Sequence, residues 1–326
     1  MGTRIDRASA FAPVRVDRNE PGYEIWFAVL IDPATRQGLW IRYTCFARQP
    51  DRKQGYLWAS FFDAHSPGFG DGPAFGAHYD ADAAFGDSEL KFRQGRLSAD
   101  RMSGHMRTPR GELQWDIHFR HRFDPVSHGR GGLLERLAGV SSTVLSPFAL
   151  ASGEIKLGGT RYKKDQLHAV FMHIHGWRRV NVLHWLWAPV FDNTDSLGVE
   201  ALTVRARSFL PPLTMATLRS GNEIFHGESI LRGGSHVYPG MHYQIKCGPH
   251  RVKLRGRLNT DQKTGYIYHD PDRSKRFIVQ SDVSDAECWL STGNRKQHLV
   301  NSGAAAIEFH GLQPWPDVMY LDPFED

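Results

Sequence analysis

The chain has 326 residues, of which 40% are hydrophobic and 23% are charged, and 40 Lys+Arg against 35 Asp+Glu give a net charge of +5. These are ordinary values for a globular protein, at a length typical of two domains. The basic residues form no block or tail, so no nucleic-acid partner is expected, and no segment has the roughly 20 apolar residues of a membrane span.

The three cysteines, Cys45, Cys247 and Cys288, are odd in number and lie at no metal-like spacing. This pattern predicts neither a disulfide framework nor a cysteine zinc site. Free thiols favour a reducing compartment, and the first 22 residues contain no apolar core like that of a signal peptide. We therefore expect a cytoplasmic protein.

Along the chain, the dominant pattern alternates apolar and polar residues, as half-buried strands do. GELQWDIHF (111–119) is the clearest case, and the same pattern recurs before it in YEIWFAVLI, LWIRYTCFA and YLWASFFD and after it in ALTVRARSF, MHYQIKCG, RVKLRGRL, GYIYHD, RFIVQSDV and AIEFHG. In RVKLRGRL, the basic residues are expected to form a solvated face over a buried one. Only GGLLERLAGVSS (131–142), late in the first half, predicts a helix.

So many short antiparallel strands must close on themselves or stack, because open sheet edges invite aggregation. The length suits two successive antiparallel barrels. The alternation is interrupted between about 145 and 170, and we place the boundary so that residues 1–165 form the N-terminal domain and residues 166–326 the C-terminal domain.

Several segments resemble, in the same order, the family of carotenoid 1,2-hydratase (hydroxyneurosporene synthase). They are YEIWFAVLIDPATRQGLWIRYTCFA, WASFFD, FGDSELKF, GELQWDIHF, SPFALASGEIKLGGTRY and HIHGWRRVNVLHWLW. That family is similar to tocopherol cyclase and to the fungal decalin-forming Diels-Alderases. The resemblance implies an all-β fold of two tandem lipocalin-like barrels, with a hydrophobic ligand cavity in and between them.

Two short elements carry the resemblance to the family's site. Glu24-Ile25-Trp26 resembles its Glu-x-Trp element, and Ile174-His175-Gly176-Trp177 resembles its Asp-His-Asn-Trp or Asp-His-Glu-Trp element. In the second, isoleucine and glycine replace the acidic residue and the Asn or Glu, which removes two groups that could orient or protonate a substrate.

The stretch FMHIHGWRRVNVLHWLWAPVFDN (171–193) concentrates the candidate chemistry. In a strand, His173 and His175 share one face, and three interpretations are open. The pair could chelate a metal with His184 or Asp192 as third ligand; it could be hydrogen-bonded inside an aromatic core; or His175 could bind a ligand or move protons in an apolar pocket.

Glu24 and Trp26 share a face of the first strand, where a desolvated carboxyl could act as a general acid. The alternative is an ion pair between Glu24 and Arg42 or Arg178. In VLHWLWAPVF, His184 lies on the face opposite Trp185 and Trp187, and we expect the tryptophans to form the pocket wall, although core packing would also explain them.

The sequence therefore predicts an enzyme that needs no cofactor and cyclises, hydrates or isomerises a hydrophobic isoprenoid- or polyketide-like molecule. The predicted catalytic residues are His175 and Glu24, and the predicted substrate-binding residues are Trp26, His173, Trp177, Arg178, His184, Trp185 and Trp187. One alternative is a non-catalytic carrier of a lipid or pigment, and a second is a metal-dependent enzyme that uses His173 and His175.

Overall fold

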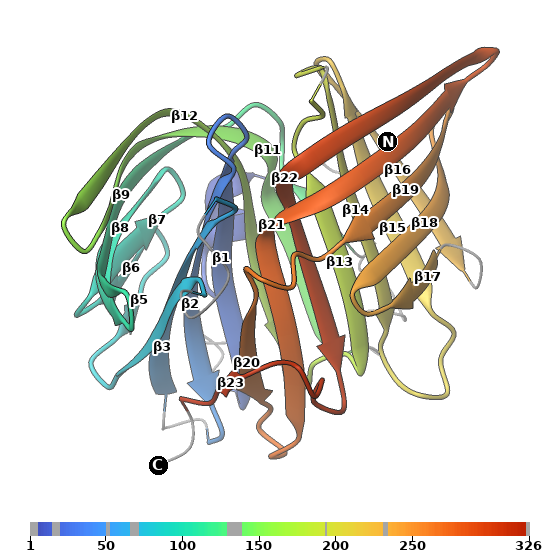
Figure 1. Cartoon of the computed structure of the whole chain (residues 1–326). Coiled ribbons are helices and arrows are strands. Elements are labelled where there is room, and N and C mark those ends of the chain that lie inside the picture. Colours follow the sequence, from blue (N-terminus) through green and yellow to red (C-terminus); the bar gives the residue numbers. More distant parts are fainter. Residues whose placement is uncertain are drawn as a thin grey trace.

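The structure, a computed structural model, describes residues 6–14, 20–49, 53–65, 72–128, 139–192, 194–230 and 234–323. Two large antiparallel sheets lie side by side and each is strongly curved (Figure 1). Within these ranges the single helix is α1 (Arg7–Phe11), and no helix is long and apolar enough to cross a membrane.

The first sheet contains 12 strands, in the order β4-β3-β2-β1-β12-β11-β9-β8-β7-β6-β5 with β10 paired to β11. Their bounds are β1 (Gly22–Asp32), β2 (Gln37–Ala47), β3 (Lys53–Asp63), β4 (Ala74–Asp80), β5 (Ala84–Phe85), β6 (Glu89–Phe92), β7 (Gly95–Ser98), β8 (Arg101–Thr108), β9 (Gly111–Arg120), β10 (Val126–Ser127), β11 (Val140–Leu157) and β12 (Thr160–Gly176).

The second sheet contains 11 strands, in the order β16-β15-β14-β13-β22-β21-β19-β18-β17, with β20 paired to β21 and β23. Their bounds are β13 (Val182–Ala188), β14 (Leu197–Arg205), β15 (Leu213–Ser220), β16 (Glu223–Ile230), β17 (Gly234–Val237), β18 (Gly240–Cys247), β19 (His250–Arg257), β20 (Thr264–His269), β21 (Lys275–Thr292), β22 (Arg295–Gly311) and β23 (Tyr320–Leu321).

Each sheet curls until distant strands touch across its concave side. In the first sheet, a Cβ on Gly76 of β4 would lie only 2.4 Å from the carbonyl oxygen of Arg107 on β8. In the second, a Cβ on Gly227 of β16 would lie 2.2 Å from the carbonyl oxygen of Lys246 on β18. Glycine is required where two backbones approach this closely. Each curled sheet encloses its own apolar core.

A third apolar cluster lies between the two sheets and joins side chains from both. Ile25 and Val29 of β1 and Met172 of β12 contribute from the first sheet, and Trp185 and Trp187 of β13 from the second. Strands β1 and β2 are therefore buried on both faces, one toward the barrel core and one toward the other sheet. The alternation expected for YEIWFAVLI is therefore not found: the segment is almost continuously apolar, as a strand buried on both faces requires.

The predicted all-β fold of two tandem lipocalin-like antiparallel barrels is confirmed. The predicted boundary at 165/166 falls within β12, and the first sheet continues to Gly176. The predicted helix at 131–142 lies mostly outside the described residues, and its last three residues, 140–142, begin β11.

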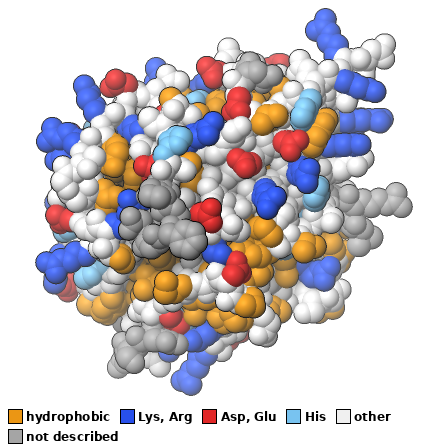
Figure 2. Space-filling model, in the orientation of Figure 1, with side chains coloured by type: hydrophobic (Ala, Val, Ile, Leu, Met, Phe, Trp, Pro, Cys, Tyr) orange, Lys and Arg blue, Asp and Glu red, His pale blue; other side chains and the backbone are white. Residues whose placement is uncertain are grey.

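The solvated basic face predicted for RVKLRGRL is confirmed, because β19 alternates strictly between buried and exposed residues. Figure 2 shows lysine and arginine side chains projecting at the end of the molecule to which the β21–β22 hairpin extends.

Candidate functional site

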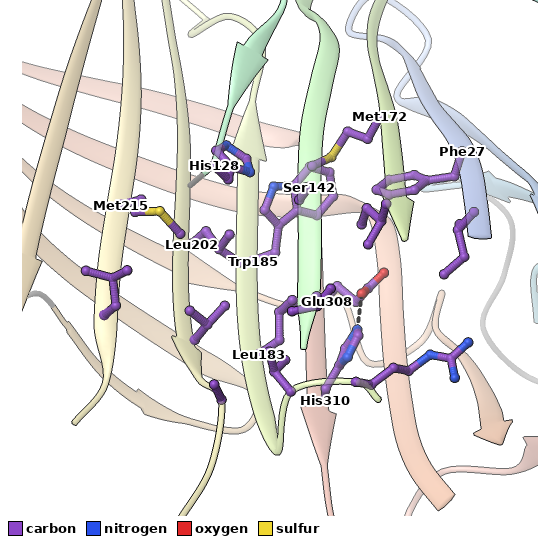
Figure 3. Close-up of a pocket in the computed structure, with 18 of the residues that line it drawn as sticks. Phe27, His128, Ser142, Met172, Leu183, Trp185, Leu202, Met215, Glu308 and His310 are labelled. Atoms are coloured by element: carbon purple, nitrogen blue, oxygen red, sulfur yellow. Dashed lines mark hydrogen bonds and ion pairs between the residues drawn. The ribbon is translucent and has the colours of Figure 1, made fainter. Parts of the chain in front are cut away.

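A cavity of about 730 Å³ lies between the two sheets. Its walls come from β1, β2, β11 and β12 of the first sheet and from β13, β14, β15, β16, β20 and β22 of the second (Figure 3). Most of the lining is apolar: Tyr23, Ile25, Phe27, Trp40, Met172, Ile174, Val180, Leu183, Trp185, Leu202, Val204, Leu213, Met215 and Ile230. A chamber of this size and character suits a hydrophobic small molecule.

The alternation of side chains along β1 and β12 explains this lining. Ile25 and Phe27 point away from the core of the first barrel, and so do Met172 and Ile174 on the neighbouring strand. Because successive side chains point to opposite faces, one face of each strand fills the barrel and the other faces the cavity.

One pair of ionisable side chains enters this apolar chamber from β22. Glu308 and His310 are two residues apart on the same face, and His310 Nε2 contacts Glu308 Oε1. Both side chains are close to nine-tenths buried. The Tyr266 hydroxyl lies 3.1 Å from Glu308 Oε2, while among the described residues His310 Nδ1 has no hydrogen-bond partner.

A second polar group lies further along the cavity, where His128, Ser142 and Trp185 come together (Figure 3). His128 Nε2 is 3.6 Å from Oε2 of the buried Glu200, and Trp185 Nε1 donates a hydrogen bond to Glu200 Oε1 at 3.0 Å. Burial raises the pKa of Glu200, but the charge of His128 and the hydrogen bond from Trp185 outweigh it, so that the pKa lies below its usual value. Glu200 is therefore ionised at neutral pH.

Several predicted site residues do come together, on the barrel side of β1 and β12. His173 Nε2 lies 2.8 Å from Glu24 Oε1, and the indole of Trp26 stacks on the His173 ring with centroids 4.5 Å apart. The His175 ring lies 5.7 Å from that of His173. None of these four residues lines the cavity between the sheets.

The segment containing α1 closes over this group. The carbonyl oxygens of Ala10 and Phe11 accept hydrogen bonds from His173 Nδ1 at 2.7 Å and from Trp26 Nε1 at 2.8 Å. Both ring nitrogens of His173 are thus engaged. Among the described residues, no group of three or more His, Cys, Asp or Glu side chains is arranged to hold a metal ion.

The structure separates the faces of β13 as the alternation predicts. Trp185 lines the cavity, whereas Trp187 packs between the sheets and donates a hydrogen bond to the Pro147 carbonyl oxygen at 3.2 Å. His184 lies on the opposite face and stacks on His236 with ring centroids 4.8 Å apart. Burial, with a contribution from the charge of His236, lowers the pKa of His184 to about 3, so this ring stays neutral.

Trp177 and Arg178 lie in the connection between the sheets. Trp177 is 45% exposed, and the guanidinium of Arg207 lies 5.6 Å from the centre of its ring. Arg178 Nε lies 3.4 Å from Asp272 Oδ2. Neither residue lines the cavity.

No protein-family model matches the chain. Two uncharacterized proteins, from Mycobacterium tuberculosis strains CDC 1551 and H37Rv, are each 22% identical to it over 320 residues, which cover 95% of this chain and 93% of each relative.

Three solved structures extend the comparison. A candidate AttH protein of Nitrosomonas europaea superposes with a TM-score of 0.62 at 12% identity, over 96% of this chain and 98% of that one. Kievitone hydratase from Nectria haematococca superposes with a TM-score of 0.58 at 11% identity, over 96% of this chain and 94% of that one. The structure of CghA with Sch210972 superposes with a TM-score of 0.53 at 9% identity, over 89% of this chain and 88% of that one. The chain shares the fold of these proteins. The predicted resemblance is thus confirmed in the fold, and a hydratase is among the neighbours.

Sequence reasoning missed Glu308 and His310. The segment AIEFHG was recognised as a strand, and its alternation already places the carboxyl and the imidazole on one face. An acidic residue and a histidine at this spacing, inside an otherwise apolar strand, were the available signal.

Proposed function

We propose that this chain is an enzyme of the hydratase or cyclase type, acting on a hydrophobic isoprenoid- or polyketide-like molecule bound between the two sheets. The observation that carries the proposal is the Glu308–His310 pair, which faces a large apolar cavity. A reaction on carbon–carbon double bonds needs a positioned proton donor or acceptor, a dry chamber and no redox cofactor.

The pair can both accept and donate a proton. When the Glu308 carboxylate accepts a hydrogen bond from His310 Nε2–H, the neutral ring presents Nδ1 as a base. When the ring is protonated, Nδ1–H is an acid and the adjacent carboxylate stabilises the positive charge. Because Nδ1 has no partner among the described residues, a bound substrate or water could take that position.

The comparisons support an enzyme through the fold. Kievitone hydratase has this fold over nearly the whole chain, and its name gives the reaction class, while CghA has been solved with the small molecule Sch210972. A non-catalytic carrier of a lipid or pigment needs the same chamber but no proton donor. The buried Glu308–His310 pair favours the enzyme, because an apolar ligand alone gives no reason to bury ionisable groups.

The test is to incubate the purified protein with a panel of polyprenyl and polyene compounds and to follow products by liquid chromatography and mass spectrometry. Hydration adds the mass of one water, whereas cyclisation or isomerisation changes retention at constant mass. We expect Glu308→Gln and His310→Asn to lower turnover by roughly 10²–10⁴-fold while the substrate still binds.

The chain offers a matched control at its surface. His298 Nε2 lies 3.1 Å from Glu287 Oε2, and both side chains are exposed. His298→Asn and Glu287→Gln make the same chemical changes outside the cavity and should leave turnover unchanged. Binding with no turnover in any variant or in the wild type would favour a carrier.

The catalytic roles predicted for His175 and Glu24 remain predictions, and the same assay discriminates them from the proposed site. If His175→Ala or Glu24→Gln abolished turnover while Glu308→Gln and His310→Asn did not, the reaction would belong inside the first barrel. The proposed site between the sheets would then be wrong.

A further inference from the structure

We propose that the ligand of this cavity carries an acidic oxygen group, a carboxylate or an enolate, which binds at Arg42 and Arg179. This inference rests on the proposed function and adds the class of substrate: an amphipathic molecule with a hydrophobic body and an anionic head. Both arginines line the cavity, and their side chains are at least 95% buried.

Arg42 projects from β2 into the cavity, and no carboxylate among the described residues pairs with it. Its Nε donates to Thr44 Oγ1 at 2.9 Å, and its guanidinium lies 3.7 Å from the centre of the Tyr268 ring. No ion pair joins Arg42 to any other described residue, although Glu308 is near enough to influence it electrostatically. Burial, and then the positive charge of Arg179, holds the pKa of Arg42 well below its usual value.

Arg179 approaches the same tyrosine ring, with its guanidinium 4.6 Å from the ring centre. Nη1 donates to Asp270 Oδ1 and to the His269 carbonyl oxygen, both at 2.7 Å. Nε and Nη2 are buried and have no hydrogen-bond partner among the described residues. An unsatisfied buried donor is energetically costly. Nε and Nη2 of Arg179 are therefore available to donate hydrogen bonds to a ligand in the cavity.

The nearby carboxylates do not balance these charges. Asp270 is shared between Arg179 and Arg276, whose Nη2 lies 3.9 Å from Asp270 Oδ2. Glu308 is already held by His310 and Tyr266. A buried cation without a counterion is strongly disfavoured, so an anionic ligand would supply the missing charge. Guanidinium groups suit this role because their planar donors match the geometry of a carboxylate.

The position of the two arginines also orients the ligand. Tyr268 is near both groups, because its ring centre lies 3.7 Å from the Arg42 guanidinium and 6.0 Å from the centre of the His310 ring. An acidic head at Arg42 would therefore lie close to the Glu308–His310 pair, with the hydrophobic body directed toward Leu202 and Met215 (Figure 3). The reacting carbons would be those near the acidic group.

The experiment compares two probes that differ mainly in the head group, all-trans-retinoate and all-trans-retinol. Their dissociation constants are measured with the full chain by quenching of tryptophan fluorescence and by calorimetry. We expect retinoate to bind roughly tenfold or more tightly than retinol, as a charge-assisted hydrogen bond provides. Arg42→Gln should reduce this preference to about one, and Arg42→Lys should retain part of it, because it keeps the charge.

Arg93→Gln is the control, since Arg93 lies at the surface in an exposed ion pair with Asp82 and its loss removes the same charge. Thermal melts establish that each variant is folded. Equal affinity for the two probes in the wild type, or a preference unaffected by Arg42→Gln, would overturn the inference while leaving the proposed function intact. If neither probe bound, the inference would also fail, whereas the proposed function would still be decided by turnover of the polyprenyl and polyene panel.

Discussion

Asp282 gives the prediction whose magnitude follows most directly from the structure. This residue of β21 lies between the sheets, where a Cβ on Gly38 of β2 would come within 2.6 Å of the Asp282 Cβ. Its carboxyl is completely buried; Oδ1 accepts a hydrogen bond from Gln280 Nε2 at 2.7 Å, and Oδ2 has no partner among the described residues. Burial raises the pKa of Asp282 from 3.8 to about 8, against the hydrogen bond from Gln280 and with help from the charge of Glu308.

A pKa that is higher in the folded state makes the stability depend on pH with a defined sign. The contribution of Asp282 is fully present below pH 3.8 and is lost as the pH rises toward about 8, because ionisation then favours the unfolded chain. Each pH unit in this window costs about 1.4 kcal/mol. Between pH 5 and pH 8 the cost is therefore on the order of 4 kcal/mol, as an upper bound.

Asp282→Asn replaces the protonated acid by a neutral side chain of the same shape. We expect the free energy of unfolding of the variant to exceed that of the wild type by an amount that grows as the pH is raised from 5 to 8. Urea unfolding at several pH values measures this, and Asp261→Asn, which removes an exposed carboxylate, controls for the loss of one charge. A difference between wild type and Asp282→Asn that stayed constant with pH would refute the reasoning.

Two further predictions concern packing. Trp185→Ala removes part of the cavity wall and should weaken the binding of hydrophobic ligands and destabilise the fold by roughly 3 kcal/mol. Trp289→Ala, at the surface, should do neither. Calorimetry measures the binding, and urea unfolding measures the stability. Gly76→Ala places a Cβ 2.4 Å from the Arg107 carbonyl oxygen and should lower the free energy of unfolding by about 1–3 kcal/mol. Gly72→Ala, whose Cβ would have no atom within 4 Å, should leave it unchanged. Equal thermal stability of these two variants would contradict the close approach of β4 and β8.

The all-β architecture could be predicted because the local alternation of apolar and polar residues identifies its strands. Strict alternation in GELQWDIHF and RVKLRGRL marks strands with one buried face, and both are strands of that kind in the structure. The apolar run YEIWFAVLI also carried the information that β1 is buried on both sides. That information was not used to predict that the two sheets pack against one another.

The candidate site was harder to predict because it depends on which face of β12 turns toward the second sheet. His173 and His175 share a face with Trp26 and Glu24, as the alternation indicates, but that face belongs to the first barrel. The opposite face carries Ile174, which was regarded only as a departure from the family pattern. Periodicity separates the two faces of a strand, and only tertiary contacts decide which one borders a cavity.

Glu308 illustrates the same limit from the other end of the chain. Its hydrogen-bond partner Tyr266 comes from β20 and its cross-strand neighbour Trp185 from β13, and no local pattern brings these residues to Glu308. Arg42 was considered only as a partner for Glu24, yet in the structure it faces the cavity. Long-range pairing therefore determines the chemistry of this site.

The central claim is that a hydrophobic small molecule occupies the space between the sheets. Val204→Trp fills this space from β14, and Val300→Trp adds the same side chain at the exposed surface of β22. Retinol binding, measured by fluorescence titration, should be abolished by Val204→Trp and unchanged by Val300→Trp. Equal binding by the wild type and both variants would place the ligand elsewhere and contradict the account.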